Sequence, residues 1–141
     1  SANGTDEILA MPLGFLTLPP RSLGPTTEGA VRSMVVADGV LYFATADRVE
    51  KIALDGGAPE TILADRGEVF DTVRVRDGYL YVASARDFAS RSGAVYRVRL
   101  SDGERIKIFD RLYVTNVEVD DRWAYAFTRD ESSGEVLRVA R

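Results

Sequence analysis

The sequence contains no cysteine and no histidine among its 141 residues. Without cysteine there is no disulfide framework, no thiol nucleophile and no zinc–thiolate site. Without histidine there is no Ser-His-Asp triad and no imidazole ligand for a metal. Long apolar runs are also missing, because Pro12 and Gly14 interrupt the most apolar stretch, Ile8–Leu18. That stretch is far shorter than the ~20 residues of a membrane-spanning helix, so the sequence predicts no membrane span.

Excess positive charge is absent as well. The chain carries 18 basic and 22 acidic residues, for a net charge of −4. A nucleic-acid-binding domain usually has a basic surplus, so this balance argues against nucleic acid as a partner. The hydrophobic fraction of 45% is that of an ordinary globular chain.

The sequence does contain an internal repeat. Val36–Phe43 (VADGVLYF) is matched by Val75–Val82 (VRDGYLYV) and, more weakly, by Val119–Ala126 (VDDRWAYA). A second element follows each copy, at Val49–Gly57, Val95–Gly103 and Val136–Val139, and a third follows the first two copies, at Thr61–Asp65 and Ile106–Asp110. A period of about 40 residues is typical of repeat architectures in which each unit stacks on its neighbours.

Each element alternates apolar and polar residues with period two, which predicts β-strands. Asp38-Gly39 and Asp77-Gly78 separate the first two strands of their copies, and this dipeptide suits the positive φ angles of a tight hairpin turn. Gly56-Gly57 and Asp102-Gly103 mark the next turns. The sequence therefore predicts an all-β protein made of four-stranded antiparallel meanders, the unit of a β-propeller.

The pattern of Asp38–Tyr42 followed by Leu54–Ala64 resembles bacterial β-propellers related to the YWTD propellers of lipoprotein receptors. The resemblance covers roughly residues 29 to 141 and implies a six-bladed ring and an exported protein, in the periplasm or secreted. The third copy departs from the pattern, since Arg122 replaces the turn glycine and no fourth strand follows. A propeller fold does not itself fix a function, because propellers serve binding, scaffolding and hydrolytic roles alike.

We expect residues 1–7 to be a disordered N-terminus, 29–66 to form the first blade, 67–111 the second, and 112–141 a third blade without its fourth strand. Residues 8–28 are expected to form a strand pair and a linker. Three blades do not close a ring, whereas two chains supply six. The expected partner is therefore a second copy of the chain, with strand exchange in which the N-terminal strand completes the last blade. The closing residues are Phe15, Leu16, Leu18, Val136 and Val139. The alternative is that the chain is part of a longer propeller with no independent activity.

Two sets of residues are candidates for ligand binding. The first set lies where the first strand of each copy begins, at the mouth of the predicted central channel: Arg32, Ser33, Asp71, Thr72, Thr115 and Asn116. The second set lies in the loops between second and third strands, which vary in length among the copies: Arg86, Asp87, Phe88, Arg91, Arg129 and Asp130. Loops on a rigid scaffold often carry binding specificity, and arginines bind carboxylate or phosphate with two parallel hydrogen bonds. Strand capping and solvation of loops are the structural alternatives for these residues.

The function that these observations favour is a non-catalytic binding or assembly module that recognises itself and a protein or small polar ligand. No cofactor and no catalytic residue is expected. The alternative is a metal-assisted hydrolase or lyase, with calcium held near Asp71 and Asn116. Neither acidic pair, Asp120-Asp121 or Asp130-Glu131, has the spaced ligands of a calcium loop.

Overall fold

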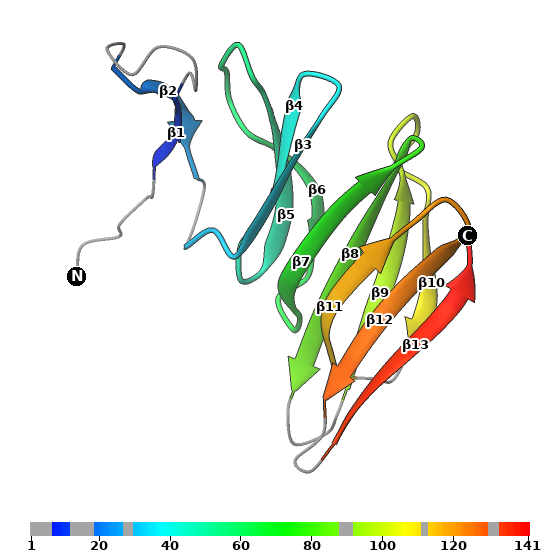
Figure 1. The fold of residues 1–141 in the computed structure, drawn as a ribbon. Coiled ribbons are helices and arrows are strands. Elements are labelled where there is room, and N and C mark those ends of the chain that lie inside the picture. Colours follow the sequence, from blue (N-terminus) through cyan, green and yellow to red (C-terminus); the bar gives the residue numbers. More distant parts are fainter. Residues whose placement is uncertain (1–6, 12–18, 27–29, 88–91, 111–112, 130–132) are drawn as a thin grey trace.

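The computed structural model describes residues 7–11, 19–26, 30–87, 92–110, 113–129 and 133–141. All its regular structure is β (Figure 1). Nothing in this described part is a helix that has the length and hydropathy to cross a membrane. The described residues form a two-stranded sheet and three larger antiparallel sheets, each made from strands that are consecutive in sequence.

The three larger sheets are the blades predicted from the repeat. Blade 1 contains β3 (Ser33–Ala37), β4 (Val40–Ala44), β5 (Arg48–Ala53) and β6 (Glu60–Ala64). Blade 2 contains β7 (Val69–Arg76), β8 (Tyr79–Asp87), β9 (Ser92–Arg99) and β10 (Arg105–Asp110). Blade 3 contains β11 (Val114–Val119), β12 (Trp123–Arg129) and β13 (Gly134–Ala140). The prediction of an all-β fold built from four-stranded antiparallel sheets is confirmed, and the described part of blade 3 has three strands.

The Asp-Gly turns adopt the predicted backbone. Asp38 and Asp77 have φ angles of 49° and 47°, and the glycines after them both have 75°. Aspartate tolerates this left-handed region and glycine enters it without strain, so the two residues reverse the chain within one tight turn. In blade 2, β8 extends to Asp87 and β9 begins at Ser92, so Arg86 and Asp87, which the sequence predicted to lie in a loop, belong to a strand.

The N-terminal segment contains a pair of strands outside the three blades. β1 (Glu7–Ala10) pairs with β2 (Arg21–Pro25), with a register shift between Ile8 and Leu9. The expected closing strand, Phe15–Leu18, lies outside the described residues. β1 and β2 form a separate sheet that packs on blade 1, on the side opposite blade 2 (Figure 1).

Three apolar clusters hold these sheets together. The first lies between blades 1 and 2 and includes Tyr42, Val73 and Val82. The second lies between blades 2 and 3 and includes Tyr81 and Val117. The third joins the hairpin β1–β2 to blade 1, where Phe43 is fully buried. Successive residues of the central strands thus face opposite neighbours, as the period-two pattern requires.

Candidate functional site

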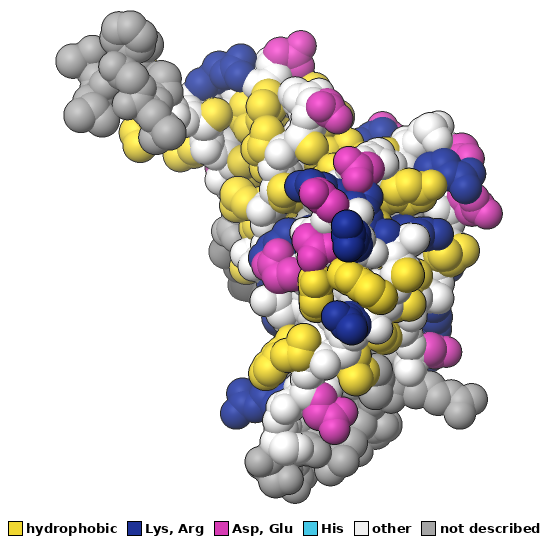
Figure 2. Space-filling model, turned by 45° about the vertical axis from the view of Figure 1, so that its right-hand side comes forward, with side chains coloured by type: hydrophobic (Ala, Val, Ile, Leu, Met, Phe, Trp, Pro, Cys, Tyr) yellow, Lys and Arg dark blue, Asp and Glu magenta, His cyan; other side chains and the backbone are white. Residues whose placement is uncertain are grey.

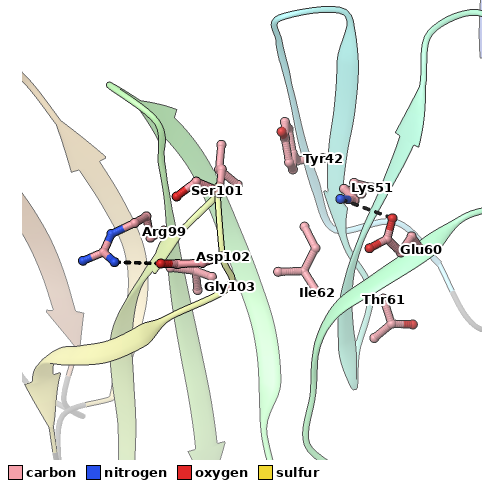
Figure 3. A pocket seen from close by; sticks show the side chains of 11 residues that line it. Tyr42, Lys51, Glu60, Thr61, Ile62, Arg99, Ser101, Asp102 and Gly103 are labelled. Atoms are coloured by element: carbon pink, nitrogen blue, oxygen red, sulfur yellow. Dashed lines mark hydrogen bonds and ion pairs between the residues drawn. The ribbon is translucent and has the colours of Figure 1, made fainter.

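A groove of about 330 Å³ lies between blades 1 and 2. Its blade 1 wall is a row of side chains that are in register across three strands, since Tyr42 pairs with Lys51 and Lys51 pairs with Glu60. The opposite wall comes from the end of β9 and the turn that follows it, Val98–Gly103 (Figure 3). The groove lies at the end of the blades that carries the Asp-Gly turns, away from the long loops nominated from the sequence.

The groove has an apolar floor and charged rims. Ile62, Val98 and Leu100 supply apolar lining. On one rim Lys51 Nζ lies 3.2 Å from Glu60 Oε2, and on the other Arg99 lies 2.8 Å from Asp102 (Figure 3). Both pairs are partly exposed, so each contributes little to stability and its charges remain accessible to a ligand.

Burial, nearby charges and hydrogen bonds shift the pKa values of Tyr42 and Asp102, which both line the groove. Burial raises the pKa of Tyr42, and nearby Asp38 raises it further, against the opposite effect of Lys51. The backbone N–H of Glu104 and the guanidinium of Arg99 lower the pKa of Asp102. At neutral pH the groove therefore presents a protonated phenol and an ionised carboxylate, which are groups that bind a ligand by hydrogen bonds.

The predicted channel-mouth residues lie at equivalent positions and connect the blades to one another. In each blade, the residue lies opposite the same position of the second strand. Ser33 pairs with Ala44, Thr72 with Ala83, and Asn116 with Phe127. Ser33 Oγ accepts a hydrogen bond of 3.2 Å from the Val73 N–H on the next blade. Thr72 Oγ1 donates to the Thr115 carbonyl at 3.3 Å, again across blades.

The charged members of this set are also paired between blades. Arg32 lies 2.7 Å from a carboxylate oxygen of Asp71. Asn116 is exposed. Among the described residues no three His, Cys, Asp or Glu side chains come together as potential metal ligands. A ligand at the channel mouth stays a prediction, and the contacts of Arg32, Ser33, Asp71 and Thr72 join neighbouring blades.

The structure describes only part of the predicted loop set. Arg86 is exposed at the end of β8, beside Gly67, and Arg129 is exposed at the end of β12. Asp87 belongs to β8, where it pairs with Ser92 of β9. Phe88, Arg91 and Asp130 lie outside the described residues.

The two predicted closing residues on β13 differ in how far they are exposed. Val136 is 68% exposed, whereas Val139 packs against the cluster between blades 2 and 3. Phe15, Leu16 and Leu18 lie outside the described residues. Within the described part β13 pairs only with β12, so its other edge is open.

The outer face of blade 3 and the part of the blade 1 face that the hairpin β1–β2 does not cover carry exposed apolar side chains. On blade 1, Met34 is 55% exposed, although the equivalent Val73 and Val117 are fully buried by the preceding blade. On blade 3, Phe127 is 41% exposed, although the equivalent Ala44 and Ala83 are fully buried by the following blade. Figure 2, which brings forward the side of the molecule that carries β13, shows apolar side chains gathered among charged ones. At the positions of Met34 and Phe127, side chains that neighbouring blades cover inside the stack are therefore exposed at its two ends.

The open face of blade 3 is rich in aromatic side chains. Trp123, Tyr125 and Phe127 alternate along β12 and point to the same side of the sheet. The Arg138 guanidinium lies 4.5 Å from the centre of the Trp123 ring, a cation–π contact. The repeat assigns Tyr42, Tyr81 and Tyr125 to one position. The structure shows that the following blade covers Tyr42 and Tyr81, whereas Tyr125 lies on the open face of blade 3.

Comparison with solved structures defines the class of protein. A chain in the crystal structure of a nidogen/laminin complex matches 98% of this chain with a TM-score of 0.74 at 11% identity. The N-terminal domain of Nup159 matches 89% with a TM-score of 0.55 at 9% identity. Together with the stacked four-stranded sheets, these similarities establish a β-propeller fold, as the repeat predicted.

This chain spans 55% of the nidogen/laminin chain and 35% of the Nup159 domain. No family model and no curated protein sequence matches it. The blades described above therefore correspond to part of a propeller, and the structural similarity at this level of identity concerns the fold alone.

Proposed function

We propose that this protein is a non-catalytic propeller module that binds proteins, and that its first partner is a second copy of itself. The observation that carries the proposal is the contrast between equivalent positions: Met34 is 55% exposed where Val73 and Val117 are 0%. A large apolar side chain that is exposed to water, at a position that is buried in the other two blades, favours association with a complementary face.

The two open faces are suited to each other. One is the aromatic face of blade 3, and the other is the face of blade 1 that carries Met34 and Val36. Inside the chain, the face of blade 2 that corresponds to the aromatic face of blade 3 packs on the face of blade 3 that corresponds to the Met34 face of blade 1. Blades 1 and 2 pack together through the corresponding pair of faces. Packing blade 3 of one copy on blade 1 of the other at both ends produces a ring of six blades, the number that the resemblance to YWTD-type propellers implies.

The hairpin β1–β2 fits this arrangement. It covers the outer part of the blade 1 face, over Ile52 and Phe43, and leaves Met34 and Val36 of β3 exposed. A three-stranded blade 3 of the partner would lie over the uncovered inner part. The open edge of β13 would then lie next to the hairpin, where an N-terminal strand of the other copy can pair with it.

Light scattering with gel filtration tests the association. We expect a mass of twice 15.5 kDa at micromolar concentration. Met34→Asp and Phe127→Asp should each give the mass of one chain, because each places a charge in the proposed interface. Ile106→Asp is the matched control: Ile106 is also exposed, at 42%, but lies on β10 within the stack. It should leave the mass of the dimer unchanged.

Mixing the two disruptive variants tests which faces meet. A heterodimer of Met34→Asp with Phe127→Asp has one interface that carries no substitution, so the mixture should associate although neither variant does alone. A wild-type mass of one chain at all concentrations would overturn self-association and favour closure by further blades of a longer chain. A dimer that survives both substitutions would overturn the proposed faces.

Engineered cysteines test the strand exchange, and the absence of native cysteine makes the result unambiguous. Leu9 and Val136 are 56% and 68% exposed. Leu9→Cys mixed with Val136→Cys should form a disulfide between chains under mild oxidation, whereas Leu9→Cys mixed with Ile106→Cys should not. Equal cross-linking of both mixtures would contradict the proposed arrangement.

A further inference from the structure

Leu54, Leu100 and Arg141 occupy one position in the three blades. The N–H of Leu54 donates to the Gly39 carbonyl and that of Leu100 to the Gly78 carbonyl, both at 2.9 Å. The N–H of Arg141 donates to the Arg122 carbonyl at 3.2 Å, at the corresponding turn of blade 3. Arg141 therefore stands where the other two blades carry a leucine.

The Arg141 side chain binds a set of acceptors between blades 2 and 3. Its Nε donates to the Tyr81 hydroxyl at 3.2 Å and its Nη1 to the Asp120 carbonyl at 2.7 Å. Its Nη2 donates to the carboxylate of Asp77. Tyr81 and Asp77 of blade 2 thus form a binding site for a guanidinium group, and the chain itself fills this site from blade 3.

The same two acceptors recur one blade earlier. Tyr42 corresponds to Tyr81, and Asp38 corresponds to Asp77 in a turn with nearly identical φ angles. Asp38 lies close enough to Tyr42 to raise the pKa of its phenol. Leu100 replaces Arg141 at this boundary, and among the described residues no cation forms an ion pair with Asp38. The groove of about 330 Å³ lies at this boundary, lined by Tyr42 and Leu100.

We propose that the groove between blades 1 and 2 binds an arginine side chain of a partner protein. The guanidinium would bond to the Tyr42 hydroxyl and the Asp38 carboxylate, as that of Arg141 does to Tyr81 and Asp77. The aliphatic stem would lie on Leu100 and Ile62, and the Glu60 carboxylate at the rim would attract the charge.

The chemistry of the groove favours arginine over other ligands. A planar guanidinium binds a phenol oxygen and a carboxylate at the same time, whereas the ammonium of lysine is a compact, strongly hydrated charge. Anionic ligands are disfavoured because Glu60 and Asp102 already lie against the two basic side chains of the groove. This site goes beyond the proposed self-association, since both of its walls belong to one chain.

A titration followed by ¹H–¹⁵N NMR tests the site. The experiment uses the Phe127→Asp variant beside the wild-type chain, so that failure of self-association does not affect the result. We expect N-acetyl-argininamide to cause saturable shifts of the amides of Lys51, Thr61 and Gly103. The citrulline analogue, which has the same shape without the charge, should bind about tenfold more weakly, as loss of a charge-assisted hydrogen bond implies. The lysine analogue should also bind more weakly.

Variants separate the proposed contacts. Tyr42→Phe removes one acceptor and should weaken binding of the arginine probe about tenfold. Tyr125→Phe, the same change at the equivalent position of blade 3, is the matched control and should have no effect. Asp38→Asn should abolish the preference for arginine over citrulline, and asparagine tolerates the left-handed turn, so the fold should be kept.

Leu100→Arg is the most direct test, because it places the chain's own arginine where Arg141 stands in the next blade. It should fill the groove and abolish binding of the probe. Shifts that do not saturate, equal binding of citrulline, or full binding to folded Leu100→Arg or Asp38→Asn would overturn the proposal.

Discussion

Arg141 Nε donates a hydrogen bond of 3.2 Å to the hydroxyl of Tyr81, 60 residues earlier in the chain. The Arg141 side chain is only 13% exposed. It lies between blades 2 and 3 and anchors the end of β13, whose outer edge has no described partner strand. The hydrogen bond to Asp77 lowers the pKa of that carboxyl, with a further contribution from the positive charge of Arg141.

This contact predicts a specific acid dependence. A carboxyl whose pKa is lower in the folded state adds stability above its unfolded pKa, here near 3.8, and loses that contribution as the pH falls toward the folded value. Asp77→Asn should therefore reduce the slope of melting temperature against pH below about pH 5. Asp55→Asn, in an exposed turn, is the control and should keep the slope. Identical slopes in Asp77→Asn and the wild type would contradict a role for the Arg141–Asp77 contact.

A second prediction concerns a buried carboxylate. Glu68 is 7% exposed, and its Oε1 accepts a hydrogen bond of 2.7 Å from the hydroxyl of Tyr96, which is 6% exposed. Tyr96→Phe removes this donor and should lower the free energy of unfolding by about 1–3 kcal/mol, the cost of a buried polar group left without its partner. Urea unfolding measures the change.

Glu68→Gln is the matched control, because its amide oxygen still accepts a hydrogen bond from Tyr96. It should cost clearly less than Tyr96→Phe, and equal costs would contradict the prediction. Burial and the bond to Glu68 raise the pKa of Tyr96 above its usual 10.0. The wild type should accordingly lose stability as the pH rises above 10, where unfolding releases the phenol proton, and Tyr96→Phe should lose less.

The repeat predicted the blades because every turn and strand of a propeller is local in sequence. Asp38-Gly39 and Asp77-Gly78 identify their hairpins from the dipeptide alone, since few residues accept φ angles of 49° and 75° in succession. The alignment of Ser33 with Thr72 and Asn116 also follows from period and register.

Contacts between blades are not local, and the sequence did not predict them. The alignment does place Arg141 with Leu54 and Leu100, but the contact with Tyr81 depends on how blade 3 is staggered against blade 2. The groove was missed for the same reason, because it forms between a row on blade 1 and a turn on blade 2. The pairing of Glu7–Ala10 with Arg21–Pro25 joins strands separated by an intervening segment, and the repeat carries no information on such a partner.

A third prediction concerns charge pairing between blades 2 and 3. The Arg74 guanidinium donates to both carboxylate oxygens of Glu118, with Nε 3.0 Å from each. The two side chains are 31% and 56% exposed, so solvent screens the pair. A double-mutant cycle to alanine should give a coupling of about 0.2–1 kcal/mol, which falls as salt is added.

The matched control is the pair Lys107–Asp110, with one contact of 3.5 Å and side chains that are 46% and 59% exposed. Its double-mutant cycle should give a smaller coupling energy than that of Arg74 with Glu118, because a single contact of this length lacks the geometry of an arginine that donates to both carboxylate oxygens. A larger coupling at Lys107–Asp110 would contradict the ranking.

The last prediction concerns the docking of the N-terminal hairpin on blade 1. Gly24 of β2 has a φ of +150°, and a Cβ added there would lie 2.9 Å from Ile52 Cδ1 and 3.0 Å from the Gly57 carbonyl oxygen. Gly24→Ala should separate the hairpin from blade 1 or force Ile52 to move, and overpacking of this kind costs about 1–3 kcal/mol. Gly103→Ala is the matched control, since its φ is +76° but a Cβ there meets nothing within 4 Å. Both variants carry backbone strain, and only Gly24→Ala should also increase proteolytic cleavage near β1 and β2. Equal cleavage of the two variants would show that the close approach of Gly24 to Ile52 does not hold the hairpin in place.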